Sequence, residues 1–375
     1  MNEAMPNLTR YESTGINRKF NLADGHAHQK QNKTQHGIVS GLPSIFFQAE
    51  SMLQGAVERE FQKAFFQLAG QHSVVDSERT MLCYSASLAT DLIATFLSAN
   101  SYSVTLLEPC FDNLATILMR RNVSLTPIRE HELSPERLEA SLSEMKTDAL
   151  FLTLPNNPTG FSLDHDYFVK VVELCTDLQK ILILDHTFRF YNDGKLFDSY
   201  QIMEDAGISY LTVEDTGKTW PTQDLKCSIL GASKDLFDEL RIYHNDILLN
   251  VSPFILRLLT EYVIDSDVNG LDKSVRDTIR TNRATLRKAL AGTTLSPAVE
   301  DSTVSVEWLE INNQDLDSLA IVDALAAANI GILPGNHFYW HEPDIGSRFV
   351  RVALARDCDE FADACKHLQQ QALLR

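Results

Sequence analysis

A chain of 375 residues is long enough to form one large domain and a smaller one. Hydrophobic residues make up 44% of it and charged residues 22%, which is ordinary for a soluble globular protein. The net charge of −18 argues against nucleic acid and anionic membranes as partners, and no apolar run reaches the length of a membrane span.

The cysteines and the N-terminus favour a cytoplasmic protein. The six cysteines are scattered and form no CxxC pair, which is typical of reduced thiols. The first residues, Met1 to Met5, lack a basic region followed by an apolar stretch, so we expect no signal peptide.

Residues 1–40 predict an N-terminal arm and not a core element. They are mostly polar, with little apolar periodicity and many His, Gln, Asn and Lys residues between Asn21 and Gly37. Residues 44–69 instead space Phe, Leu, Val and Ala as an amphipathic helix does, so we expect one long helix there.

Apolar runs that predict strands alternate with helical patterns from about Met81 onward. The predicted strands are 104–107, 149–153, 181–184 and 210–213, and residues 164–178 predict one of the helices between them. Continuous apolar strands separated by helices indicate a mainly parallel sheet that is covered on both faces. We therefore predict a large α/β domain over residues 41–270.

The remaining residues, 271–375, predict a smaller α+β domain. A long helical stretch begins near Ile255 and runs through Leu290. Strand patterns follow at 304–308 and 348–354, and helical patterns at 316–328 and 359–373.

Four residues in this framework carry distinctive chemistry. Asn157, Asp185 and Lys218 each follow a predicted strand, and Arg351 lies within the last one. The carboxyl ends of parallel strands are where such sheets collect their chemistry. Each residue alone is also compatible with a turn, a strand end or a surface position.

Together they match what pyridoxal phosphate (PLP) requires. A lysine forms an imine, an aspartate keeps the pyridine nitrogen protonated, an asparagine binds the phenolic oxygen and an arginine captures a substrate carboxylate.

With this ordered set, residues 40–375 resemble the fold-type I PLP enzymes, the aspartate aminotransferase superfamily. The resemblance implies a large PLP-binding domain, a smaller C-terminal domain and a homodimer. It also implies further cofactor contacts. Phe111 stands where an aromatic ring stacks on PLP, and Lys226 stands where a phosphate-binding arginine is usual. Ser85, Ala86 and Ser87 open a predicted helix whose free amides suit a phosphate, although a plain helix cap is an alternative.

Two departures from the family pattern argue against a routine aminotransferase. Asp215 stands three residues before Lys218, where a phosphate-binding serine is common. Phe188 stands three residues after Asp185, where a tyrosine usually bonds the phenolic oxygen.

With Glu12, Asp24 and His26 in the arm, the chain resembles the PLP- and dioxygen-dependent L-arginine oxidases and hydroxylases of natural-product pathways. The resemblance implies that the arm closes over the substrate. Glu12, Asp24 and Asp215 are then candidates to surround the guanidinium, for which carboxylates are natural partners, and His26 is a candidate acid/base. We expect no metal site, because His26 and His28 form a lone HxH pair.

The function that this resemblance implies is oxidation of L-arginine by O2 through quinonoid intermediates, with Lys218 as general base. The products would be didehydroarginine or 2-imino or 2-keto acids, with hydrogen peroxide. One alternative is an arginine 4-hydroxylase that gives 4-hydroxy-2-ketoarginine, with His26 assisting water attack. Another is a conventional aminotransferase or decarboxylase acting on a basic amino acid, and a third is a catalytically silent PLP-fold regulator. Homoarginine or canavanine would also fit the charges.

Overall fold

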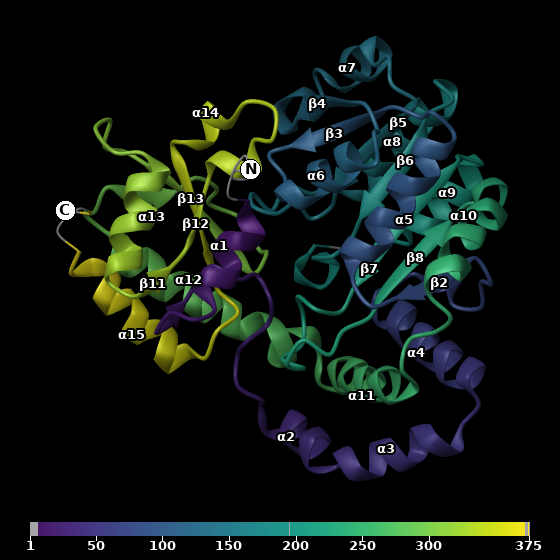
Figure 1. Ribbon diagram of the computed structural model, residues 1–375, viewed down its shortest axis with the longest axis horizontal. Helices are drawn as coiled ribbons and strands as arrows, with labels where there is room; N and C mark the ends of the chain where they lie inside the picture. The colour runs from purple at the N-terminus through teal and green to yellow at the C-terminus, as the bar shows by residue number, and fades with distance from the viewer. Residues whose placement is uncertain (1–6, 195, 372–373, 375) are drawn as a thin grey trace, which may run out of the picture.

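The computed structural model describes residues 7–194, 196–371 and 374. A seven-stranded mixed sheet forms the centre of the larger lobe, with strand order β2-β8-β7-β6-β5-β3-β4 (Figure 1). Its strands are β2 (Thr80–Cys83), β3 (Val104–Glu108), β4 (Leu125–Arg129), β5 (Ala149–Thr153), β6 (Ile181–Asp185), β7 (Tyr210–Asp215) and β8 (Ser228–Ala232). The four predicted strands of this sheet are confirmed.

Strand direction brings the carboxyl ends of six strands to one edge of the sheet. Strands β4, β3, β5, β6 and β7 are parallel, and β8 runs antiparallel to both of its neighbours, β7 and β2. Strand β2 therefore points the same way as β7. The carboxyl ends of β2, β3, β4, β5, β6 and β7 all lie on the same side, where the polar side chains of a site can meet.

Helices cover both faces of this sheet, as its fully buried strands require. One face packs against α5 (Ala86–Ala99), α6 (Asp112–Arg120) and α10 (Lys234–Ile247). The other packs against α4 (Gln54–Leu68), α7 (Leu138–Glu144), α8 (His165–Asp177), α9 (Ser199–Ala206) and α11 (Pro253–Asn269). In the described part of the chain, no helix has both the length and the apolar character to cross a bilayer.

The prediction of one helix over 44–69 is wrong, because two helices occupy this region. Helix α3 (Leu42–Ser51) ends at Met52, where the backbone becomes extended, and α4 begins at Gln54. Helix α4 buries Phe61 and Phe65, whereas α3 leaves Phe46 and Phe47 exposed. Both helices have apolar spacing, so periodicity alone did not reveal the break.

The smaller lobe is built on a four-stranded antiparallel sheet, which fits the predicted α+β domain. The strand order is β12-β13-β10-β9. The strands are β9 (Leu295–Pro297), β10 (Val306–Ile311), β12 (Leu333–Pro334) and β13 (Phe349–Ala353), and the helices are α12 (Asp277–Leu290), α13 (Ser318–Ala327), α14 (Pro343–Gly346) and α15 (Cys358–Gln369). The predicted final helix ran to 373, and residues 372–373 lie outside the described residues.

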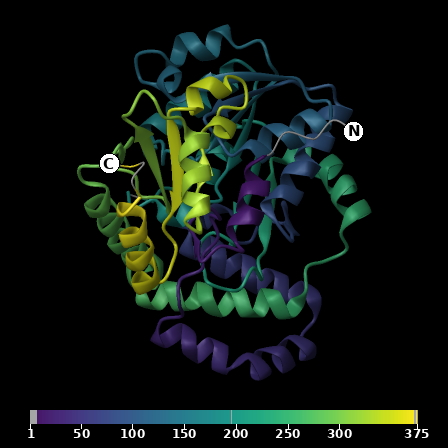
Figure 2. The same cartoon turned by 60° about the vertical axis from the view of Figure 1, so that its left-hand side comes forward.

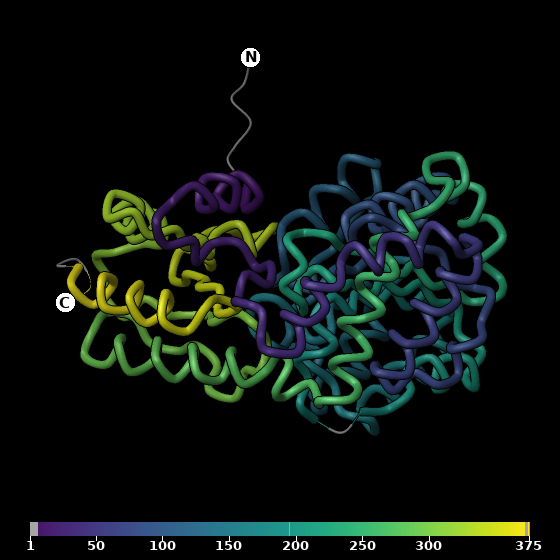
Figure 3. Tube along the Cα trace, turned by 90° about the horizontal axis from the view of Figure 1, so that it is seen from below, coloured from purple at the N-terminus to yellow at the C-terminus, as the bar shows by residue number. Residues whose placement is uncertain are grey.

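The arm is more ordered than the sequence predicted. It contains α1 (Leu8–Gly15), β1 (Phe20–Asn21) and α2 (Lys33–Ser40), and β1 pairs with β11 (Ile330–Gly331) in parallel. The Leu22 amide donates a hydrogen bond to the carbonyl of Gly331, and the Leu22 carbonyl accepts one from the Ala353 amide, both at 2.8 Å. Leu8, Phe20 and Leu22 are buried. The arm thus adds a strand to the smaller lobe, and α1 lies where the two lobes meet (Figures 1 and 2). Figure 3 shows its path continuing across the larger lobe.

Candidate active site

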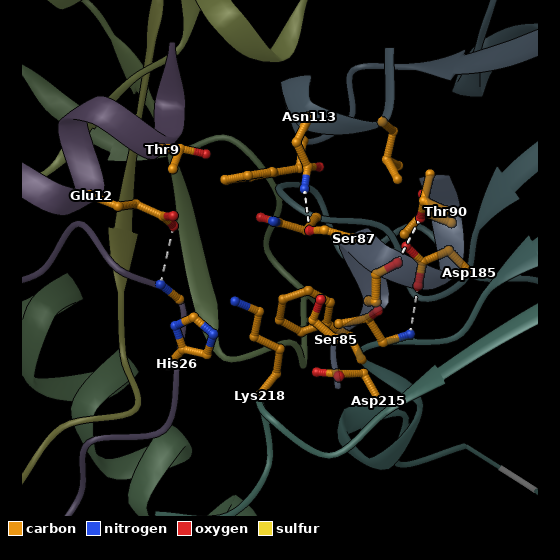
Figure 4. Close-up of a pocket in the computed structure, with 18 of the residues that line it drawn as sticks. Thr9, Glu12, His26, Ser85, Ser87, Thr90, Asn113, Asp185, Asp215 and Lys218 are labelled. Carbon is orange, nitrogen blue, oxygen red and sulfur yellow. Dashed lines mark hydrogen bonds between the residues drawn. The ribbon is translucent and has the colours of Figure 1, made fainter. Parts of the chain in front are cut away.

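A cavity of about 220 Å³ lies where the arm, the smaller lobe and the carboxyl edge of the large sheet meet. Every predicted site residue except Asp24 lines it, namely Glu12, His26, Ser85, Ala86, Ser87, Phe111, Asn157, Asp185, Asp215, Lys218, Lys226 and Arg351. Figure 4 shows Lys218 near its centre, with Glu12 and His26 on one side and Asp185 and Asp215 on the other.

Neighbouring strands position the acid and the lysine. Asp185 is the last residue of β6, and Lys218 follows the end of β7 by three residues. These strands are parallel neighbours, so their ends deliver both side chains to one place. The Tyr191 hydroxyl donates to the backbone carbonyl of Lys218 at 2.5 Å and fixes the turn that carries the lysine.

The carboxyl group of Asp185 is buried in the wall of the cavity. Burial raises its pKa to about 6. Its Oδ1 accepts a hydrogen bond from the Thr187 backbone at 2.8 Å. Thr187 and Thr153 also line the cavity, and their buried hydroxyls have no hydrogen-bond partner among the described residues. Buried polar atoms are normally satisfied, so the cavity wall is suited to a polar ligand.

A buried hydrogen-bond network holds the loops that carry Asn157 and Phe111. The Asn156 amide donates to the carbonyl of Pro109 and to Glu130 Oε1, each at 2.7 Å. These two bonds tie the loop that contains Asn157 to the segment that precedes Phe111. Burial raises the pKa of Glu130 to about 7. Glu130 and Asn156 were not predicted as site residues, because their effect is on backbone position.

The N-terminus of α5 forms part of the cavity wall. Ser85 is its N-cap, and its hydroxyl accepts a hydrogen bond from the Leu88 amide at 3.2 Å. Ser85, Ala86 and Ser87 all face the cavity, where helix amides favour negative charge. Asn113 donates to Ser87 Oγ at 3.0 Å and also lines the cavity.

Arg351 projects from β13 and is completely buried. Its Nη1 lies 3.3 Å from Asn157 Oδ1, and its Nη2 donates to the carbonyl of Ala23 and lies 3.5 Å from Glu12 Oε1. Burial lowers its pKa, and the charge of Glu12 opposes this effect. Its Nε has no partner within the described residues. The guanidinium therefore belongs to the cavity and has unused capacity for a carboxylate.

Asp24 does not line the cavity, and its carboxylate is hydrogen-bonded to two histidines of the arm. Its Oδ1 accepts from His26 Nδ1 at 2.6 Å, and its Oδ2 bonds His28 Nε2. Burial alone would raise the pKa of Asp24, but these hydrogen bonds hold it well below its ordinary value. Because Nδ1 of His26 donates to Asp24, its Nε2 is the acceptor, and Lys226 Nζ lies 2.9 Å from it.

The charge of Lys218, followed by burial, lowers the pKa of His26. A lowered pKa favours the neutral imidazole, which is the form that can accept a proton.

Asp215 and Phe188 also line the cavity. Asp215 Oδ1 accepts from the Ser228 hydroxyl at 2.5 Å, and its Oδ2 accepts from the Gly217 amide at 2.9 Å. Phe188 is buried and contributes no hydrogen-bond donor to the cavity wall.

Arg356 is a site residue that the sequence analysis missed. It is buried, and it donates from Nε to the carbonyl of Asn21 at 2.5 Å, from Nη1 to that of His26 at 3.0 Å, and from Nη2 to that of Asp24. It thereby clasps the turn of the arm that carries His26. The sequence signal was weak: a charged residue two positions after the predicted strand 348–354.

Comparisons with known proteins agree with this architecture. The family model for aminotransferases of class I and II matches residues 44–368. The structure of MppP soaked with the product 2-ketoarginine is 34% identical in sequence, with a TM-score of 0.85, over 92% of this chain and 98% of that one. Aspartate aminotransferase from Thermus thermophilus with maleate is 14% identical, with a TM-score of 0.77, over 98% of this chain and 97% of that one, and it shows the fold alone.

A curated protein is also similar in sequence. Aromatic aminotransferase ISS1 from Arabidopsis thaliana is 20% identical over 292 residues, which is 74% of this chain and 71% of that protein. The family match extends from α3 to α15 and includes the lysine, the aspartate, the asparagine and the arginine of the cavity. The chain therefore belongs to the aminotransferase class I and II family, the PLP-dependent enzymes of fold type I.

Proposed function

We propose that this protein uses PLP and O2 to oxidise L-arginine. The observation that carries the proposal is the arm, whose Glu12 carboxylate and His26 imidazole line the cavity that contains Lys218. The relation to MppP, whose structure was soaked with the product 2-ketoarginine, supports an arginine-derived substrate.

The cavity residues fit the cofactor. Lys218 would hold it covalently, with Asp185 at the pyridine nitrogen and Asn157 at the phenolic oxygen. Phe111 would stack on the ring, and the amides and hydroxyls of residues 85–87 would bind the phosphate with Lys226. The unpartnered hydroxyls of the wall support a polar occupant. When bound, PLP supplies an electron sink for the bond that is broken at the α-carbon of the substrate.

The charges of the cavity suit both ends of arginine. Arg351 would bind the α-carboxylate, for which its buried guanidinium has a free Nε. Glu12 would bind the substrate guanidinium, and Asp215 would add a second carboxylate. Each oxygen of Asp215 already accepts one hydrogen bond, and a carboxylate oxygen can accept another. Asp24 would act through His26, because it does not line the cavity.

Proton transfer would be divided between Lys218 and His26. The amine of Lys218, once released by the substrate, would take the α-proton. Asp24 holds the proton on Nδ1 of His26, and once Lys226 has left Nε2 to bind the phosphate, His26 would accept a proton from water at that atom. In the overall reaction, arginine gives two electrons and two protons to O2, which becomes hydrogen peroxide. Water replaces the amino nitrogen, which leaves as ammonia.

Two features favour oxidation over routine transamination. Phe188 removes a hydrogen-bond donor from the cavity wall, so the cofactor would be more electron-rich. The arm closes the site on the side of the smaller lobe and would exclude water while O2 reacts. His26 also supports the 4-hydroxylase alternative, because a neutral base in the cavity can activate water for attack on the γ-carbon.

We also propose a cytoplasmic homodimer. Large apolar side chains are exposed on α3, where Phe47 is 64% exposed, and after α10, where Leu249 is 92% exposed. Exposed aromatic and aliphatic groups of this size are typical of contact surfaces.

Product analysis tests the proposed reaction. PLP-loaded protein is incubated with L-arginine in air, without a keto acid, in water enriched in oxygen-18. Many product molecules per active site, with hydrogen peroxide, would support oxidation, and label at the γ-carbon would identify the hydroxylase outcome. An aminotransferase would stop after about one turnover per site, and this result would refute the proposal.

A further inference from the structure

Glu12 is the carboxylate partner of Arg351. Glu12 Oε1 lies 3.5 Å from Arg351 Nη2 and accepts a hydrogen bond from the Gly25 amide at 3.4 Å. The Arg351 side chain is 1% exposed and that of Glu12 14% exposed. A guanidinium buried to this degree requires a compensating charge, because an unpaired buried ion is strongly destabilising. Glu12 is therefore paired with the same guanidinium that the proposed function assigns to the substrate carboxylate.

Substrate binding would disturb this pair. A carboxylate that approaches Arg351 competes with Glu12 for the same guanidinium. A displaced Glu12 would be a half-buried anion close to Asp112, whose pKa is raised to about 6 by burial and further by the charge of Glu12. Glu12 would then need a new cation. Lys218 and Lys226 also line the cavity, but in the PLP-loaded protein the cofactor would engage both, so the substrate itself would have to supply that cation.

The backbone that carries Glu12 is fixed, so a change of partner requires only side-chain rotation. The Leu8 amide, in the first turn of α1, donates to Asp112 Oδ2 at 2.8 Å. At the other end of the helix, Gly15 is buried against Ala23 and Gly331. Rotation about the side-chain torsions of Glu12 would move its carboxylate within the cavity while α1 stays in place.

The geometry points to Glu12 as the residue that makes this site selective for dipolar substrates. Glu12 takes the place of the substrate carboxylate on Arg351, and on binding it transfers to the distal cation of the same substrate. A ligand that carries only a carboxylate displaces Glu12 and gives it no new partner. A ligand that carries only a cation removes Glu12 from Arg351 and leaves that guanidinium unpaired. The two ends of the substrate are therefore recognised cooperatively. This inference rests on the proposed function for the identity of the distal cation.

The test uses three ligands that separate the two charges. L-Arginine carries both, L-norvaline lacks the guanidinium, and agmatine lacks the carboxylate. Their dissociation constants are measured by calorimetry on the PLP-loaded protein without oxygen, for the wild type and Glu12→Gln. Glu139→Gln removes the same charge from the exposed face of α7 and serves as the control. Glu12→Ala is a second variant, and circular dichroism checks that each variant is folded.

We expect Glu12→Gln to bind L-norvaline about tenfold more tightly than the wild type, since no ion pair must be broken. It should bind L-arginine at least tenfold more weakly, since the guanidinium loses its partner; tenfold is the effect of about 1.4 kcal/mol. The control should match the wild type. Unchanged norvaline affinity with weaker arginine binding would reduce Glu12 to a simple guanidinium contact and overturn the inference, while the proposed function would stand.

Weaker binding of both amino acids would also overturn it, because Glu12 would then only stabilise the arm. The proposed function is tested separately by the wild type alone. If wild-type protein binds L-arginine no more tightly than L-norvaline, the assignment of arginine as substrate fails, whatever the variants do.

Discussion

The clasp that Arg356 forms on the arm provides a quantitative prediction. Its guanidinium donates to three carbonyls of one turn, those of Asn21, Asp24 and His26. Hydrogen bonds from a charged group contribute about 1.5–3 kcal/mol each, so the three together contribute roughly 5–9 kcal/mol. Burial lowers the pKa of Arg356 to about 10 from 12.5, and this opposing term costs about 3 kcal/mol. The net contribution of the clasp is about 2–6 kcal/mol.

Replacing Arg356 with Met preserves the length of the side chain and removes every donor. We expect the arm to detach from the smaller lobe while both lobes stay folded, because the central strands make no contact with the clasp. Native-state hydrogen exchange measures this directly through the amides of Leu22 and His28, which bond the smaller lobe. They should exchange at least about 30-fold faster, the factor for roughly 2 kcal/mol. The amides of β5 and β6 should be unchanged.

Arg356→Lys is the matched control, because lysine keeps the charge but cannot reach three carbonyls at once. It should give an intermediate rate of exchange. Unchanged protection of the arm in Arg356→Met would refute the clasp. Equal loss of protection in the arm and in the central strands would show that Arg356 stabilises the whole fold and does not act on the arm alone.

The remaining predictions concern the cavity. Asp215→Ser should weaken arginine binding without loss of PLP, measured by calorimetry and cofactor absorbance; unchanged affinity would exclude Asp215 as a guanidinium partner. His26→Ala should change the product ratio more than the rate of arginine consumption, measured by mass spectrometry, and an unchanged ratio would remove its acid/base role. For Asp185, burial raises the pKa to about 6 from 3.8, so the folded state binds more protons than the unfolded state between these values. Its contribution to stability therefore falls as pH rises through this window, by about 3 kcal/mol in all. In cofactor-free protein, Asp185→Asn should remove this slope from the pH dependence of urea denaturation, and a slope equal to that of the wild type would contradict the assignment.

The central sheet and its polar edge could be predicted from the sequence because burial leaves a strong local signal. Strands covered on both faces are continuous apolar runs, and β5, β6 and β7 have every residue buried. Asp185 and Lys218 interrupt this pattern where the strands end, so their convergence follows from strand direction alone.

The arm could not be predicted in the same way, because backbone contacts hold it in place. Strand β1 has two residues, too few for any periodicity, and it is stabilised by pairing with β11, which is far away in the sequence. Arg356 bonds carbonyl groups, which every residue carries, so its partners leave no sequence signal. Asp24 bonds the rings of His26 and His28, and nothing in the sequence indicated which way its carboxylate turns.

Oxygen uptake is the most direct test of the proposed oxidation of arginine. Purified, PLP-loaded protein is given L-arginine without a keto acid in an oxygen electrode while its visible spectrum is recorded, with Lys218→Ala as the inactive control. If the protein oxidises arginine with O2, oxygen consumption should be sustained, should depend on arginine and should be abolished by Lys218→Ala. Absence of uptake, with arginine converted only after a keto acid is added, would mean an aminotransferase and would contradict the roles given to the arm and to Asp215.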